Sequence, residues 1–182
     1  PLEDTALLWA KGKGLSVKAL ITRSLEVPDL EQGKVLLRVD KFAFSQMSLG
    51  YLMKGFTRTF SAYHSFYQWP AEGLYRSACW GYMTVVESAH PKVAVGTRLY
   101  GLVPPCKYQL QSVGGTIPAS KNGDPAKVEL TMEGVGFNLR RFQEMEVVEA
   151  KEDELMEDWK IILQEIYTMA FYMDENLLVD TG

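Results

Sequence analysis

The sequence is poor in cysteine, in histidine and in the motifs that place a nucleophile. Cys79 and Cys106 stand far apart and lack C-x-x-C or C-x-x-H spacing, which argues against both a disulfide scaffold and a zinc site. They are best interpreted as small hydrophobes. His64 and His90 come without a serine or cysteine at an identifiable nucleophile elbow. The sequence therefore assigns no catalytic residue and no metal ligand.

The chain also lacks a basic field, a long apolar run and a nucleotide-binding turn. Its 182 residues have a formal net charge of −4, so no nucleic-acid partner is predicted. No apolar run reaches the roughly 18 residues that cross a bilayer, so no transmembrane segment is expected. Gly134-Val135-Gly136 is followed by Phe137 and has no third glycine, which indicates a strand kink or turn and not a dinucleotide fingerprint.

What is present is ordinary globular composition arranged in short strands. Apolar residues make up 47% and charged residues 23%, which indicates a folded chain with a core. Val35, Leu37 and Val39 alternate with more polar neighbours at the period of a half-buried strand. Strands are predicted at residues 6–10, 16–22, 34–42, 80–88, 97–103 and 107–111, with a hairpin turn at 11–14. Residues 113–125, rich in Gly, Pro, Ser and Asn, predict a surface loop.

Two segments depart from this strand pattern. Residues 45–76 hold a crowd of aromatics and predict a long packed loop with helical turns. Residues 152–176 carry apolar side chains mostly three and four apart, the spacing of an amphipathic helix. The acidic stretch 144–158 is interpreted as the solvated start of that helix. The predicted organisation is a β-domain over 1–150 and a helical extension over 151–182.

One constellation is more specific. A strand reading KVLLRVDKFAFS is followed by the aromatic loop, by a strand that opens with Trp80-Gly81, and by a segment from Val86 to Gly101 in which Gly96 turns into the next strand. Gly101 is expected to let another backbone pass close. This arrangement resembles the GroES-like barrel of medium-chain dehydrogenases and quinone oxidoreductases. The resemblance implies a mainly β (α+β) fold, a partly open GroES-like β-barrel with a C-terminal amphipathic helix.

The resemblance is sharper to an uncharacterised family of quinone-oxidoreductase-like proteins. It is carried by residues 35–43, 67–76, 80–102 and 163–177 and spans about residues 33–178. In related reductases a polar residue near the position of Ser45 lies beside the nicotinamide and the substrate. By this resemblance the candidates for a substrate-side cleft are Ser45, Gln46, Tyr51, Trp69 and Thr168.

The same resemblance shows where the sequence departs from the family. Met47 and Ser48 replace two asparagines, and Met169 and Ala170 replace two hydroxyl residues, so polar groups that could orient a substrate are fewer. Such proteins continue after the helix into a Rossmann-type domain, whereas this sequence ends at Gly182. Without that domain no cofactor is expected, and NADPH is expected only if a Rossmann domain is supplied.

Two functions follow from the resemblance. The favoured one is a non-catalytic accessory or scaffold subunit that binds protein partners in a larger assembly, including one at an organelle membrane. Its interface candidates are Trp159, Ile166, Phe171 and Tyr172. The alternative is a fragment of an NADPH-dependent quinone-oxidoreductase-like enzyme. A third class, carbohydrate or peptide binding through the aromatic loop, stays open. The first residue is Pro1 and not Met, which leaves the location open between a processed plastid or mitochondrial protein and a cytoplasmic one.

Overall fold

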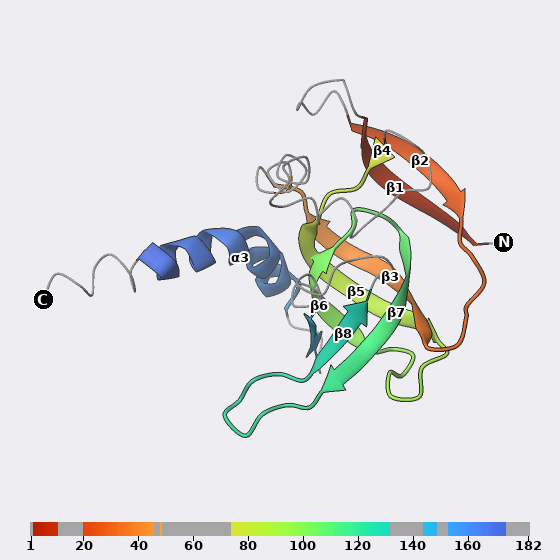
Figure 1. Cartoon of the computed structure of the whole chain (residues 1–182). Helices are drawn as coiled ribbons and strands as arrows, with labels where there is room; N and C mark the ends of the chain where they lie inside the picture. The colour runs from red at the N-terminus through yellow and green to blue at the C-terminus, as the bar shows by residue number, and fades with distance from the viewer. Residues whose placement is uncertain are drawn as a thin grey trace, which may run out of the picture. The chain divides into compact units, whose positions relative to one another are not determined.

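The computed structural model describes residues 2–10, 20–45, 48, 74–131, 144–148 and 153–173. The chain divides into two compact units, Pro1–Glu149 and Ala150–Gly182. The first unit is built of strands and the second contains a helix (Figure 1). None of the helices in these described ranges is both long enough and apolar enough to span a bilayer.

The chain opens with a small antiparallel sheet in the order β2-β1-β4. It consists of β1 (Glu3–Ala10), β2 (Leu20–Glu26) and β4 (Leu74–Tyr75). The β1–β2 register runs without a shift from Glu3 opposite Glu26 to Trp9 opposite Leu20. The predicted pairing of the first two strands is thus confirmed, while the predicted turn at 11–14 lies outside the described residues.

The remaining six strands form a closed barrel in the order β3-β5-β6-β9-β8-β7 (Figure 1). They are β3 (Lys34–Ala43), β5 (Cys79–Ser88), β6 (Arg98–Val103), β7 (Tyr108–Ile117), β8 (Lys127–Thr131) and β9 (Glu144–Val148). The mainly β class with a C-terminal helix is confirmed. The expectation of a partly open barrel is wrong, because β9 pairs with both β6 and β8 and completes the ring.

Two segments differ from the sequence-based expectation. Residues 113–117, predicted as loop, continue β7 and pair with β8 through a register shift between Val113 and Gly115. The β-bulge at that shift accommodates the glycines that suggested a loop. Residues 144–148, predicted as a solvated helix start, form β9, in which Met145 is buried in the barrel core.

The barrel core follows from strand alternation. Its fully buried members come from five of the six barrel strands and from the turn before β6. They are Val35, Leu37, Cys79, Met83, Val85, Val93, Leu99, Val103, Val128, Leu130 and Met145. Neither cysteine forms a disulfide and both are buried, which confirms their interpretation as small hydrophobes.

Glycines allow the strands to approach where the barrel is tightest. Gly96 has φ of +88°, the left-handed backbone expected of the turn into β6. A Cβ on Gly101 would lie 2.6 Å from Met145 Sδ, so it is a side chain of β9 rather than a backbone that occupies this space. A Cβ on Gly81 would collide with the backbone carbonyl of Lys41 on β3.

The second unit contains α3 (Glu154–Met173), close to the predicted helix. Asp153 caps its start, with its carboxylate accepting a hydrogen bond from Leu155 N at 3.0 Å. Glu154 and Glu157 lie in the first turn, where negative charge is favoured by the helix dipole.

Candidate functional site

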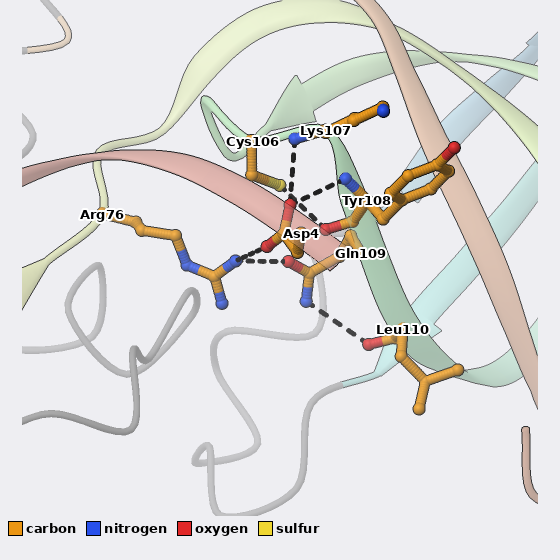
Figure 2. Close-up of polar contacts among 7 residues, drawn as sticks. All are labelled: Asp4, Arg76, Cys106, Lys107, Tyr108, Gln109 and Leu110. Carbon is orange, nitrogen blue, oxygen red and sulfur yellow. Dashed lines mark hydrogen bonds and ion pairs between the residues drawn. The ribbon is translucent and has the colours of Figure 1, made fainter. Parts of the chain in front are cut away.

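A buried polar cluster lies where β1 meets the start of β7, and we call it the junction cluster: Asp4, Arg76 and Gln109 (Figure 2). Asp4, Ala6 and Leu8 point to one face of β1, and all three are buried. Leu7 N donates to Pro105 O at 2.8 Å, and Lys107 N donates to Thr5 O at 3.0 Å. These backbone bonds hold β1 against the segment that leads into β7.

The Asp4 carboxylate accepts hydrogen bonds from backbone amides of the segment that leads into β7. Its Oδ1 accepts hydrogen bonds from Lys107 N at 3.0 Å and from Tyr108 N at 2.9 Å (Figure 2). A buried carboxylate is costly unless it is hydrogen-bonded or paired with a cation. Here two backbone donors at the strand start and a neighbouring guanidinium meet that requirement.

Arg76 supplies the positive charge. Its Nη1 lies 3.7 Å from Asp4 Oδ2 and donates to Gln109 Oε1 at 3.0 Å (Figure 2). Gln109 Nε2 in turn donates to Leu110 O at 3.3 Å. Arg76 and Gln109 are both buried. Through these hydrogen-bonded and oppositely charged side chains, the cluster connects three parts of the fold: β1, β7, and the segment that precedes β5.

Cys106 lies beside this cluster, and its thiol is unreactive at neutral pH. Burial raises the pKa of its thiol from 9.0 to about 12, partly offset by the positive charge of Arg76. The thiolate is the nucleophilic form, so at neutral pH Cys106 remains a protonated thiol. Its Sγ donates toward Tyr108 O at 3.1 Å.

Ser45 is the one substrate-side candidate whose side chain falls in the described part of the chain. Ser45 N donates to Ser48 Oγ at 3.2 Å, and Ser48 N donates to Ser45 Oγ at 3.3 Å. Ser48 O accepts a hydrogen bond from Ser77 Oγ at 2.5 Å. Ser45 therefore takes part in a reciprocal pair that fixes the chain just after β3.

The other substrate-side candidates are not described as side chains. Gln46, Tyr51 and Trp69 lie outside the described residues. Thr168 lies within α3, but its side chain also lies outside them. Whether the five candidates line one cleft stays a prediction.

Of the predicted interface residues, Trp159 and Ile166 are exposed on α3. The side chains of Phe171 and Tyr172 lie outside the described residues. Trp159 and Ile166 belong to a larger set of exposed apolar side chains that we call the α3 stripe. Its members are Leu155, Met156, Trp159, Ile162, Leu163, Ile166 and Tyr167.

A charged network on β3, β5 and β6 was not predicted. Asp40 Oδ1 accepts from Arg38 Nε at 3.0 Å and Nη2 at 2.9 Å, and its Oδ2 accepts from Thr84 Oγ1 at 2.6 Å. Arg98 Nε lies 3.6 Å from Asp40 Oδ2, and its guanidinium lies 4.4 Å from the centre of the Tyr82 ring. Arg38, Thr84 and Arg98 are cross-strand neighbours, so the sequence signal appears only once the register is known.

No group of three or more His, Cys, Asp or Glu residues that could hold a metal ion occurs among the described residues. The polar groups above bind one another across strands.

Residues 42–180 match the family model described as "Protein of unknown function (DUF2855)". The chain belongs to the DUF2855 family. A search of curated proteins gave no match for this DUF2855 chain.

Solved structures similar to the DUF2855 chain include a quinone oxidoreductase from Coxiella burnetii, at 15% identity and a TM-score of 0.41 over 75% of this chain and 39% of that chain. Another is a complex of Etr1p with NADP and crotonyl-CoA, at 13% identity and a TM-score of 0.46 over 62% of this chain and 32% of that chain. A third is the human synaptic vesicle membrane protein VAT-1 homolog-like protein, at 16% identity and a TM-score of 0.38 over 59% of this chain and 33% of that chain.

Those neighbours include the class of protein that the sequence resembles, a quinone oxidoreductase. The DUF2855 chain spans between 32% and 39% of their length.

Proposed function

We propose that this chain is a non-catalytic accessory or scaffold element, built on a reductase-like barrel, that binds protein partners in a larger assembly. The observation that carries the proposal is the α3 stripe, in which seven large apolar side chains are exposed along one helix. Contiguous apolar surface of this kind marks interaction sites in soluble proteins. Tryptophan and tyrosine, which are enriched at interface hot spots, are both present as Trp159 and Tyr167.

The buried polar groups of the first unit are hydrogen-bonded to one another and to the backbone, which supports the same proposal. Asp4, Arg76 and Gln109 bind one another and the backbone. Cys106 is held as a protonated thiol by its raised pKa. A general base or nucleophile needs a pKa near the working pH and access to substrate. These particular groups instead join strands, which is a structural task.

The alternative is that the chain is the substrate-side portion of an NADPH-dependent quinone-oxidoreductase-like enzyme. Hydride transfer requires a nicotinamide held about 3–3.5 Å from its acceptor. A pyrophosphate is usually held at a glycine-rich turn that opens a helix, and the sequence offers no such fingerprint. NADPH would therefore have to be held by another domain, with Ser45 and the other substrate-side candidates forming the facing wall.

Titration with NADPH of the protein as isolated from the cells that make it, together with any domain or partner that it carries there, separates these two functions. Quenching of its four tryptophans reports cofactor binding, and reduction of a soluble quinone reports activity. The accessory proposal predicts no saturable quenching up to about 1 mM, the upper end of ordinary KM values, and no quinone reduction. Saturable quenching in the micromolar range together with turnover would overturn it in favour of the enzyme.

Isolation of the native protein from the cells that make it tests the other half of the proposal. Native mass spectrometry should give a stoichiometric complex heavier than the 20.5 kDa of this chain and containing a second polypeptide. A species that contains this polypeptide alone would count against an accessory role.

A further inference from the structure

Strand β2 is an edge of the small sheet, because the order β2-β1-β4 gives it one neighbour in the described part of the chain (Figure 1). The direction of its backbone groups follows from β1. Leu7 N and Thr5 O bond to the segment that leads into β7, at 2.8 and 3.0 Å, so these two residues point their backbone groups away from β2. Backbone groups alternate along a strand, so those of Asp4, Ala6 and Leu8 point toward β2.

The open edge of β2 carries the alternate backbone groups. Ala6 lies opposite Arg23 in the register, so the N–H and C=O of Arg23 point toward β1. The residues on either side of it, Thr22 and Ser24, therefore point their N–H and C=O groups to the open edge. Glu26 does the same two positions further on. Such a row of backbone groups is a template onto which another chain can pair.

The backbone of β2 lacks two features that often keep an edge strand from pairing, a bulge and a proline. Its register with β1 runs without a shift from one end of the strand to the other. Its seven residues, LITRSLE, contain no proline. A regular strand with open backbone groups can pair edge to edge, so protection against such pairing has to come from its side chains.

Arg23 places a positive charge at the centre of this edge. It is the fourth of the seven residues of β2, and its side chain is exposed. Because Arg23 lies opposite Ala6, it belongs to the face of the sheet on which Ala6 and Leu8 are buried. Its Nη1 donates to Thr22 O at 3.0 Å, so the guanidinium occupies a carbonyl that an added strand would need. A charged residue that belongs to the buried face of an edge strand protects that edge from strand addition.

Arg23 also opposes the pairing of two copies of this chain directly. When two β2 strands pair antiparallel over their full length, the central residue of each strand lies opposite its own counterpart. That register brings the open backbone groups of Thr22 opposite those of Ser24 of the second copy, and it sets Arg23 opposite Arg23. The two arginines then form a non-hydrogen-bonded pair, in which the Cα atoms are only about 4.5 Å apart. Like charges directly opposite each other destabilise a strand pair.

We propose that Arg23 keeps the β2 edge from pairing with the β2 edge of a second copy. The guanidinium holds the carbonyl of Thr22 and repels its own counterpart in the full-length register. The inference is independent of the proposed function, because it concerns the sheet of the first unit and not the α3 stripe. Since the repulsion depends on like charge and not on arginine itself, it can be tested by exchanging the charge.

Analytical ultracentrifugation of the whole chain and of two variants tests the proposal. Arg23→Val should self-associate at least about tenfold more tightly than the parent chain, because a β-branched residue replaces the like charges. Arg23→Glu should associate no more tightly than the parent, because two glutamates then lie opposite each other. An equimolar mixture of the parent with Arg23→Glu should associate about tenfold more tightly than either chain alone, because arginine then lies opposite glutamate.

A second substitution identifies the edge that pairs. Ser24→Pro removes an N–H that points to the open edge, so it blocks strand addition while the bonds from β2 to β1 remain. Arg23→Val combined with Ser24→Pro should therefore return to the association state of the parent chain. Lys92→Val removes a positive charge from an exposed turn of the barrel and should leave association unchanged. Circular dichroism of each variant should match that of the parent chain, which excludes loss of folding as the cause.

Three results would overturn the proposal. The first is a folded Arg23→Val chain that associates no more tightly than the parent. The second is a mixture of the parent with Arg23→Glu that associates no more tightly than its components. The third is association of Arg23→Val that persists when Ser24→Pro is added, which would assign the contact to another surface. The mixture decides the matter alone if Arg23→Val does not fold, because both of its components keep a charged edge.

Discussion

The guanidinium of Arg76 and the carboxylate of Asp4 form a buried ion pair, with Nη1 and Oδ2 3.7 Å apart and only 9% of each side chain exposed. The distance is longer than that of a charge-assisted hydrogen bond, so the pair is held by its surroundings as much as by direct contact. Gln109 and two backbone amides complete those surroundings. The sheet of β1, β2 and β4 is thereby joined to the barrel strand β7.

Removing one member of this pair should therefore destabilise the first unit strongly. Arg76→Met leaves the Asp4 carboxylate buried beside an apolar side chain, and breaking a buried pair in this way costs roughly 3–5 kcal/mol. Thermal or urea unfolding followed by circular dichroism measures the loss. Lys92→Met, at an exposed turn position, is the matched control and should stay within about 0.5 kcal/mol of the parent. Equal effects of the two variants would contradict a structural role for the junction cluster.

Cys106 should make stability depend on pH in the alkaline range. Burial raises its pKa from an ordinary 9.0 to about 12 in the folded chain, so the contribution of the protonated thiol is fully present below pH 9. It is lost as pH rises toward 12, because the unfolded chain releases the proton first. The difference in unfolding free energy between the parent and Cys106→Ala should shrink over that interval.

The same burial gives a second readout for Cys106. A thiol reagent at pH 8 should modify neither Cys106 nor Cys79 in the folded chain, and both should react once the chain is unfolded in urea. Rapid modification of Cys106 in the folded state would contradict the raised pKa.

Much of the barrel was predictable from local pattern. The alternation of Val35, Leu37 and Val39 gave β3, and the runs that became β5 and β6 were recognised with nearly correct limits. Each is a strand in which apolar residues alternate over at least four positions or form a continuous run between turn signals. The helix α3 was predicted for the same reason, with a period near 3.6.

The errors lay where composition conflicted with pairing. Gly114 and Gly115 suggested a loop, but they lie at the register shift between β7 and β8, where a bulge tolerates glycine. The acidic residues around Met145 suggested a solvated helix start. In the structure Glu144 lies beside Lys127 at 3.1 Å while Met145 enters the core, so this acidic segment alternates as a strand.

The junction cluster could not have been predicted from spacing. Asp4 and its donors Lys107 and Tyr108 are 103 and 104 residues apart in sequence. Their contact exists only because β1 crosses the start of β7, and no local periodicity records such a crossing. Of the predicted substrate-side residues only Ser45 can be placed as a side chain, and it is engaged with Ser48.

A glycine series tests the close approach of strands in the barrel. Gly81→Ala should be the most damaging, because its Cβ meets the backbone carbonyl of Lys41, which cannot move without breaking the β3–β5 ladder. Gly101→Ala meets the end of the Met145 side chain, and its φ of +159° is one that side chains rarely adopt, so it should cost about 1–3 kcal/mol from overpacking and backbone strain together. Gly115→Ala meets only the carboxylate end of Glu129 and serves as the tolerated control. Unfolding midpoints should fall in that order, and relief of Gly101→Ala by Met145→Val would identify the clash.

Asp40 should matter more to stability than its place on the outer side of the barrel suggests. It accepts hydrogen bonds from Arg38 and Thr84 and lies near Arg98, with 17% of its side chain exposed. Asp40→Ala removes the carboxylate that Arg38, Thr84 and Arg98 share, for which a loss of about 1–3 kcal/mol is expected. Glu144→Ala removes a carboxylate with 31% of its side chain exposed, paired with Lys127, and should cost at most about 1 kcal/mol. Urea unfolding of both variants at low and high salt measures the contrast. Salt should weaken the Glu144 contribution more, since exposed pairs are screened more fully than partly buried ones. Equal losses that respond equally to salt would show that Asp40 is no more than another surface carboxylate.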